Sequence, residues 1–573
     1  MIAIKHKLSL LALFIIGFIY LGHRIYYADV DNPQKLIVTD WDALGYYMYL
    51  PATLIYHDYK KLDWIDRIDK EYPVTGGEFY QALKHENGNY YFKYLGGIAI
   101  LQLPFFTAAH IYAKVSGHYK ADGFSPPYQY AIAFGNLLYF IIALFYLRKF
   151  LLLFFEDRVV MVSLFFLTLA TNLIQYIAIN GGMSHGYIFP LYMAILWATH
   201  HWHQKPRWYW AAAIGYIIGL ATISRPTEAV MLFIPLLWNT HTKEASKAKW
   251  KLVKNYLPQL VVTVLFGLIG ILPQLLYWKS VTGSFVYDVG SKWTFLNPFF
   301  RVLFGWEKGW FIYTPITILF IIGFFFLKRY PFKNAVIWFG ILNIYIIISW
   351  FDWRYGGSYS TRALTQSYPI YTLSLAAFLQ YCSSYKWRWA LYGIGVYLIG
   401  VNLFQIYQYN RNILHYNDMN RQYYQAIYLN THPTPLQMSL LDTKDYLYES
   451  EKYSHQIIYN NTVSKEVVGQ KDTPYLIFEA TNETINPQTQ WLKVTLQLTV
   501  HSNSWKGVIQ TNYCNQEHSF RLENALTKAQ QPNIYSFYLK KTTDTCNHLS
   551  IFLNAPSPLS ATIHQLKIEA LKN

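Results

Sequence analysis

The chain has 573 residues, of which 53% are hydrophobic and only 14% charged, whereas a soluble globular protein carries roughly 25% charged residues. Apolar runs, each about 17–25 residues long and therefore able to cross a bilayer as a helix, recur from residue 8 to residue 408. This composition excludes an ordinary soluble protein. The formal net charge of +16 does not indicate nucleic-acid binding, because Lys and Arg gather in short loops between the apolar runs, as the positive-inside rule describes.

Placing these basic loops in the cytoplasm predicts a polytopic α-helical membrane protein with an inner N-terminus and an outer C-terminus. The first span lacks a small-residue cleavage pattern, so we expect a retained anchor. The stretch 96–112 would be a further span and would invert every later loop. It is short and contains Gln102, Pro104 and His110, so we expect a juxtamembrane helix in the outer interface, with a true span as the alternative. The eleven expected spans are roughly 8–27, 128–147, 159–177, 184–200, 208–223, 226–241, 255–277, 310–327, 334–350, 364–382 and 389–408.

The composition changes after residue 408, where long apolar runs end and Asn, Gln and Thr become frequent. Period-two alternation at 491–500 and 561–570 is typical of half-buried antiparallel strands. We therefore predict a transmembrane domain at 1–408 with a first outer loop at about 28–127, a connecting segment at 409–454, and an extracytoplasmic β-sandwich at 455–573. Cys514 and Cys546 are free to pair if the outer side is oxidising.

Two carboxylates, Asp40 and Asp42, follow the first span. A carboxylate at the membrane surface can serve as the base that an acceptor hydroxyl or amine needs before it attacks. The alternative is that both only cap the helix expected from Leu44, since Asp is a favoured N-cap. Asp-Trp-Asp also looks like the metal-binding D-x-D signature of nucleotide-sugar enzymes, but nucleotide sugars are cytoplasmic and this loop faces out.

Three arginines lie at outer span ends, where the positive-inside rule disfavours them: Arg225, Arg354 and Arg362. Arg binds phosphate oxygens bidentately, so these positions favour an anionic head group or a phosphorylated donor. The alternative is snorkelling or local pairing, with Glu228 and Asp352 as partners.

Two further residues are candidates at this face. Lys93 precedes the expected interfacial helix and is a fourth cation, unless it only anchors that helix. His185 follows a Gly-Gly-Met-Ser turn; a histidine in such a place is more often structural.

The pattern resembles the GT-C superfamily of membrane glycosyltransferases that use polyprenyl-phosphate sugars, and most of all the bacterial relatives of protein mannosyltransferases and aminoarabinose transferases. The resemblance covers about residues 8–408. One departure is Ala43, where the family has a Glu directly after the acidic residue, so the second carboxylate stays open. The matching features are Asp42 with Tyr46 four places on, the segment from Lys93 to Pro104, Ser184-His185, Arg225-Pro226, and the aromatic Gly-Gly loop from Trp350 to Arg362.

The resemblance implies an inverting transfer at the outer face of the cytoplasmic membrane. Asp42 would act as base or orient the acceptor, which is a protein, a lipid or a glycan. The cations that would stabilise the leaving lipid phosphate are Arg225, Arg354, Arg362 and Lys93, while the spans would supply a groove for the polyprenyl tail. No cofactor or metal is required, although Asp40 and Asp42 together could hold a divalent ion.

Three other functions compete with this one. A transporter should carry charged residues in mid-span, and the spans are nearly free of them. A polysaccharide polymerase or ligase would share the outer arginines and the lipid-linked donor, but the Asp-rich first loop favours a transferase. The last alternative makes the β-region the working part, as a binding or assembly module held at the membrane.

Overall fold

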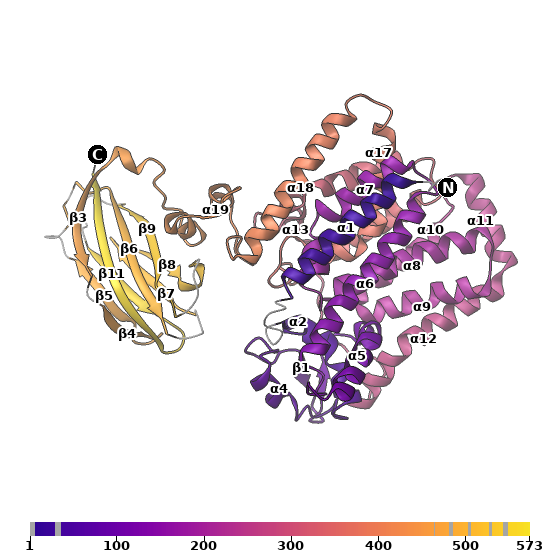
Figure 1. Cartoon of the computed structure of the whole chain (residues 1–573), viewed down its shortest axis with the longest axis horizontal. Coiled ribbons are helices and arrows are strands. Elements are labelled where there is room, and N and C mark those ends of the chain that lie inside the picture. Colours follow the sequence, from indigo (N-terminus) through magenta and orange to yellow (C-terminus); the bar gives the residue numbers. More distant parts are fainter. Residues whose placement is uncertain are drawn as a thin grey trace. The chain divides into compact units, whose positions relative to one another are not determined.

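The computed structural model describes residues 6–28, 36–462, 464–480, 485–486, 488–501, 506–525, 530–541 and 548–572. The chain divides into two compact units, Met1–Leu403 and Phe404–Asn573. The first unit is helical, and the second carries the long strands of an all-β domain after several short helices (Figure 1).

Within the described residues, five helices are long and apolar enough to cross a membrane: α1 (Lys7–Tyr26), α5 (Gly97–Ser116), α6 (Pro126–Leu151), α12 (Leu257–Thr282) and α18 (Arg388–Asn410). The other predicted spans are shorter, less apolar or interrupted. Prolines explain two of the breaks, because Pro226 and Pro315 lack an N–H and begin new 3₁₀ turns. The count of eleven spans therefore stays a prediction.

The remaining helices of the first unit have these bounds. Those near the N-terminus are α2 (Trp41–Tyr47), α3 (Tyr49–Leu54) and α4 (Ile65–Glu71). The central ones are α7 (Asp157–Leu169), the π-helix η2 (Gln175–Ile179), α8 (Ser184–Gln204), α9 (Trp208–Ser224), η3 (Pro226–Leu232), α10 (Phe233–Leu237) and α11 (Lys243–Asn255). The last are α13 (Arg301–Phe304), α14 (Trp310–Tyr313), η4 (Pro315–Thr317), α15 (Ile318–Ile322), η5 (Gly323–Phe326), α16 (Lys333–Ile348), η6 (Arg362–Ser367) and α17 (Tyr368–Cys382).

Helices α9 and α12 approach each other closely because glycines face each other along their contact. A Cβ on Gly215 would lie 1.9 Å from the carbonyl oxygen of Thr263, and one on Gly219 would lie 2.3 Å from that of Gly267. Small residues let helix backbones pack in this way inside a membrane. The rest of α12 is largely exposed, as expected for a helix that faces lipid.

Helix α5 lies at the same end of the first unit as α2 and the short antiparallel hairpin of β1 (Ala82–Lys84) and β2 (Tyr90–Phe92) (Figure 1). Its first residue, Gly97, abuts Ser224 at the end of α9. Towards its other end, His110 Nδ1 lies 2.5 Å from the hydroxyl of Tyr128, in the first turn of α6. Tyr130, in the next turn of α6, donates to the carbonyl of Ala28, just after α1. These contacts favour the interfacial placement, which stays a prediction because the helix is also long enough to span.

The second unit begins within the last turns of α18. The short helices that follow are α19 (Arg421–Ala426), α20 (Pro435–Met438), η7 (Ser439–Leu441) and η8 (Ser450–Lys452). Two antiparallel sheets follow. One has the order β5 (Tyr475–Ala480), β10 (Leu549–Asn554), β7 (Val508–Tyr513), β8 (Gln516–Arg521); the other has β3 (Ser454–Asn461), β11 (Leu559–Lys572), β6 (Trp491–Val500), β9 (Asn533–Lys540), with β4 (Lys465–Gly469) also pairing β11. The 3₁₀ turn η9 (Leu522–Asn524) follows β8.

The alternation predicted for 491–500 is present in β6, where Leu492, Val494, Leu496 and Leu498 are fully buried. They share one hydrophobic core with residues of the other sheet, such as Ile551. An all-β C-terminal domain is therefore confirmed. Cys514 is buried, whereas Cys546 lies outside the described residues, so the disulfide stays a prediction.

Candidate functional site

The first unit contains a cavity of about 600 Å³ among the ends and connecting loops of its helices. It is formed by α2, the segment before α5, the first turn of α8, the start of η3, the loop 289–293, the loop 350–356 and the start of η6. Seven of the ten candidate residues line it: Asp42, Tyr46, Lys93, His185, Arg225, Asp352 and Arg362. The structure thus brings together residues from loops that the sequence predicts to share one face.

Asp42 is held by three donors. Its Oδ1 accepts hydrogen bonds from Tyr94 (2.5 Å) and Tyr80 (2.8 Å), and its Oδ2 pairs with the guanidinium of Arg362. Burial alone would raise the pKa of Asp42, but the Arg362 charge and the two tyrosine hydroxyls together lower it to about 2. The carboxylate is therefore ionised at any physiological pH.

Asp40 lies beside Asp42 but does not line the cavity. Trp41, between the two carboxylates, has a positive φ of 46°, an unfavourable conformation for a residue with a Cβ. Asp40 is the N-cap residue of α2, although its side chain makes no capping hydrogen bond. Burial raises the pKa of Asp40 to about 6, and the Asp42 charge adds to the rise. The two carboxylates therefore differ in protonation below about pH 6, where Asp40 binds its proton and Asp42 stays ionised.

Three cations line the cavity without a carboxylate partner. Lys93, Arg225 and Lys292 all border it, and within the described part of the chain none of them forms an ion pair. Lys93 lies over the ring of Tyr80, 5.4 Å from its centroid. Lys292 is held in place by its own backbone, whose carbonyl accepts from Phe351 N–H at 3.0 Å. We call these three residues the cationic cluster; only Lys292 was missed by the sequence reasoning.

Glu228 faces inward and is not the local partner that the sequence suggests for Arg225. It is fully buried, accepts from the hydroxyl of Tyr192, and accepts from Gln366 Nε2 at 3.0 Å. The 3₁₀ turn of η3 explains this direction, because Glu228 N–H bonds the carbonyl of Arg225 and starts a tight turn after an extended residue. Gln366 in turn contacts His185, and Thr227, which lines the cavity, donates to Glu228 Oε1 at 3.2 Å, so Glu228 is linked to the cavity through its neighbours.

Arg354 and Asp352 occupy different places in the loop before η6. Asp352 is exposed at the cavity. Arg354 is exposed and does not line the cavity; its guanidinium lies 5.1 Å from the ring centroid of Trp353. The buried Lys308 holds this loop in place, because its ammonium donates to the carbonyls of Arg354 (2.9 Å) and Gly356. Arg354 therefore lies outside the lining of this cavity, and its predicted role in binding phosphate stays a prediction.

No group of three or more His, Cys, Asp and Glu side chains that could hold a metal occurs among the residues described. The expectation that no metal is needed stays a prediction.

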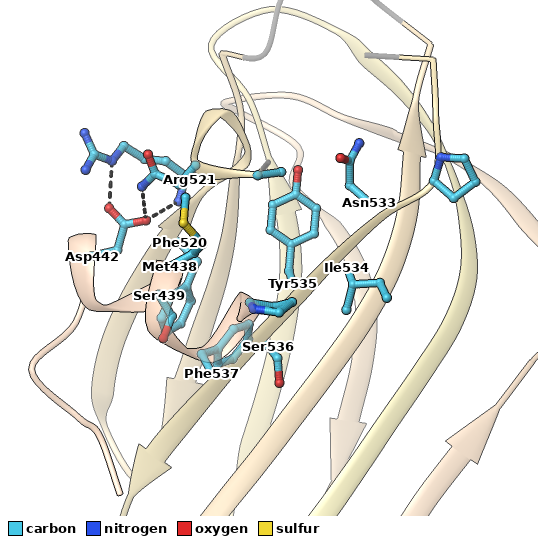
Figure 2. A pocket seen from close by; sticks show the side chains of 14 residues that line it. Met438, Ser439, Asp442, Phe520, Arg521, Asn533, Ile534, Tyr535, Ser536 and Phe537 are labelled. Carbon is cyan, nitrogen blue, oxygen red and sulfur yellow. Dashed lines mark hydrogen bonds and ion pairs between the residues drawn. The ribbon is translucent and has the colours of Figure 1, made fainter. Parts of the chain in front are cut away.

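A second cavity, of about 240 Å³, lies within the second unit between α20 and strand β9. Figure 2 shows Asp442 at its edge, bonded to Arg521. Asp442 accepts from Arg521 N and Nε and from Asn524 Nδ2, and Arg521 also pairs with Asp418 at 2.6 Å. These contacts fasten the connecting segment to the sandwich, so the charged groups here are already used within the unit.

No protein-family model matches this sequence, and no curated protein matches it. Solved structures with a partial likeness include the following three proteins. The oligosaccharyltransferase of Archaeoglobus fulgidus in the apo form is 14% identical over 73% of this chain and 57% of that chain, with a TM-score of 0.40. The archaeal oligosaccharyltransferase AglB from the same organism, in complex with an inhibitory peptide and a dolichol-phosphate, is 13% identical over 74% of this chain and 57% of that chain, with a TM-score of 0.39. The arabinosyltransferase EmbB from Mycobacterium smegmatis is 9% identical over 96% of this chain and 64% of that chain, with a TM-score of 0.38.

The chain thus spans between 57% and 64% of the length of these three proteins. Because the likeness is weak in both identity and superposition, it carries no argument about the activity, donor or acceptor of this chain. The GT-C resemblance stays a prediction from the sequence.

Proposed function

We propose that the chain is an inverting glycosyltransferase that moves a sugar from a polyprenyl-phosphate donor to an acceptor at the outer face of the cytoplasmic membrane. The observation that carries the proposal is the cavity itself, where an ionised carboxylate, Asp42, shares one space with the unpaired cationic cluster. Arg225 is half-buried, Lys93 and Lys292 are exposed at the cavity, and three such cations without counter-ions favour an anionic ligand. A lipid phosphate at the end of a membrane helix bundle provides that charge.

An apolar cavity adjoins this site and supports a lipid-linked donor. It has a volume of about 400 Å³, shares Pro226, Thr227 and Trp293 with the reaction cavity, and continues along η3 and α16. Its other lining residues are aliphatic or aromatic. The phosphate would lie in the polar cavity, while the first isoprene units would occupy the apolar one.

The chemistry follows from the groups present. A carboxylate offers about four acceptor positions, and Tyr80, Tyr94 and Arg362 occupy three of them. The fourth can accept from the hydroxyl or amine of the acceptor and aim it at the anomeric carbon. As the new bond forms, the bond from the anomeric carbon to the phosphate oxygen breaks, and the lipid phosphate leaves with the electron pair and one more negative charge. The cationic cluster stabilises that charge.

The low pKa of Asp42 refines its role. A group with a pKa of about 2 is a weak base, so Asp42 orients the acceptor and takes its proton only late in the transfer.

Asp42→Asn tests the proposal. The amide is isosteric and can still accept from Tyr80 and Tyr94, but it leaves Arg362 without its counter-charge, so thermal unfolding in detergent is measured beside transfer to show that the variant folds. We expect release of polyprenyl phosphate from a panel of polyprenyl-phosphate hexoses and pentoses to fall by about 10³-fold or more, which is the scale of losing an essential catalytic group. Asp66→Asn, at an exposed position of α4, is the matched control and should behave as wild type. Unchanged turnover in Asp42→Asn would overturn the proposal.

A further inference from the structure

His185 carries a buried polar atom that nothing in the fold uses. The residue is only 1% exposed, stands at the first turn of α8, and lines the reaction cavity. Its Nδ1 lies 2.8 Å from Oε1 of Gln366, whereas its Nε2 has no hydrogen-bond partner among the described residues. Buried polar atoms are almost always paired, so a cavity-lining nitrogen without a partner indicates a ligand that completes it.

Three side chains determine which of the two nitrogens carries the proton. Glu228 accepts at both of its oxygens, from Tyr192 and from Gln366. The amide nitrogen of Gln366 therefore faces Glu228, and its amide oxygen faces His185. An oxygen that can only accept requires a proton on Nδ1, which leaves Nε2 as an unprotonated acceptor in the neutral imidazole.

An unprotonated nitrogen cannot bind phosphate, because both groups are acceptors. It can accept from a hydroxyl. Arg225, of the cationic cluster, directly follows α9, which packs beside α8. The sugar is joined directly to the phosphate, so a hydroxyl of the sugar comes within reach of the first turn of α8 when the phosphate is held at Arg225.

We infer that His185 Nε2 accepts a hydrogen bond from a hydroxyl of the donor sugar, and that Gln366 and Glu228 are positioning residues that set its tautomer. The inference rests on the proposed function and deepens it, since it assigns the recognition of the sugar, as distinct from that of the lipid phosphate, to this relay.

Two substitutions separate this role from a structural one. His185→Asn places an amide nitrogen near Nδ1, which keeps the contact with Gln366 but removes the acceptor at Nε2. His185→Gln places an amide oxygen near Nε2, which keeps the acceptor and loses the contact with Gln366. The measurement is binding by the full chain in lipid nanodiscs, with undecaprenyl phosphate alone and with the panel of polyprenyl-phosphate hexoses and pentoses.

We expect His185→Asn to bind the best sugar-bearing lipid about tenfold more weakly, the scale of one lost hydrogen bond, while its affinity for undecaprenyl phosphate is unchanged. His185→Gln should retain most of the sugar-dependent affinity. Glu228→Gln, which no longer fixes the orientation of Gln366, should show a smaller loss that is again confined to the sugar-bearing lipid.

The outcomes distinguish the two proposals. If His185→Asn binds the sugar-bearing lipid as wild type does, or if His185→Gln is the more damaged variant, the inference is overturned and the proposed function stands. If the wild-type chain binds no sugar-bearing lipid of the panel more tightly than undecaprenyl phosphate, both the inference and the proposed donor class are overturned.

Discussion

Arg362 pairs with Asp42 across 320 residues of sequence, and this contact joins the first turn of η6 to α2 at the cavity of about 600 Å³. The side chains of Arg362 and Asp42 are only 14% and 23% exposed. In such surroundings each charge depends on the other, because a half-buried charge without a partner is poorly solvated.

Removing the arginine should therefore damage the fold as well as the chemistry. We expect Arg362→Met to lower the free energy of unfolding by up to about 3–5 kcal/mol, the scale of breaking a buried ion pair, and to abolish transfer. The double variant with Asp42→Asn should recover part of the stability but none of the activity. Thermal unfolding in detergent measures the first effect and polyprenyl-phosphate release the second.

Arg354→Met is the matched control, because Arg354 is exposed and lies over Trp353. It should change the stability by no more than about 0.5 kcal/mol, as most surface substitutions do. If the two arginines prove equally sensitive, the assignment of distinct roles to them is wrong.

The gathering of these residues was foreseeable, whereas their pairing was not. Hydropathy and the positive-inside rule assign loops to faces, so Asp42, Arg225 and Arg362 were predicted on one side. They do not say which of several cations meets the carboxylate. Tyr80 and Tyr94 were missed because tyrosine is abundant in this chain, with 52 copies, and spacing distinguishes none of them.

The fold, too, was predictable from the sequence only in part. In a strand such as β6, successive side chains point to opposite faces of the sheet, so buried apolar and exposed polar residues alternate along the sequence. This alternation made the all-β domain predictable. Broken helices leave no such pattern, because a hydropathy window averages over a break. The region 310–327 was predicted as one span and is instead a series of short helical segments from α14 to η5.

The two neighbouring carboxylates should respond to pH in opposite ways. The pKa of Asp40 is raised from 3.8 to about 6, so the folded protein holds its proton more tightly than the unfolded chain does. The stabilising contribution is complete below pH 3.8 and is lost as the pH rises through 6, by about 3 kcal/mol on the scale of 1.36 kcal/mol per pKa unit. The pKa of Asp42 is lowered to about 2, so its contribution is constant above pH 4.

Asp40→Asn mimics the protonated form at every pH and keeps a favoured N-cap residue. We expect it to stabilise the protein at pH 7.5 and to remove the decline in melting temperature between pH 4 and 6. A melting curve measured in detergent at half-unit steps of pH tests this. A variant that retains the wild-type pH dependence would show that Asp40 is not the group that titrates.

Gly45 leaves the space that the Tyr94 ring needs to donate its hydrogen bond to Asp42. A Cβ at Gly45 would lie 2.0 Å from Cδ2 of the Tyr94 ring, so Gly45→Ala must displace the ring and lengthen its hydrogen bond to Asp42. We expect at least a tenfold fall in transfer and a stability loss of about 1–3 kcal/mol, as for other overpacked sites.

Gly22→Ala is the control for this substitution, because Gly22 is also helical and a Cβ there meets nothing within 4 Å. Alanine is the better helix former, so Gly22→Ala should be neutral or stabilising, with normal transfer. Normal transfer by Gly45→Ala would mean that the contact between Tyr94 and Asp42 is dispensable.

The placement of α5 decides the orientation of every later loop, and therefore the side of the membrane on which the cavity opens. Its first residue abuts Ser224 at the end of α9, and its His110 contacts Tyr128 at the start of α6, so we expect it to lie along the outer interface.

His118 follows this helix and is exposed. In a background without the three native cysteines, His118→Cys should react with a membrane-impermeant maleimide added outside intact cells or spheroplasts. Lys247→Cys, in the exposed basic helix α11, should react only after the membrane is opened. Labelling of His118→Cys that requires opening the membrane would mean that Gly97–Ser116 crosses the bilayer, and the cavity with Asp42 would then have to be assigned to a different combination of spans.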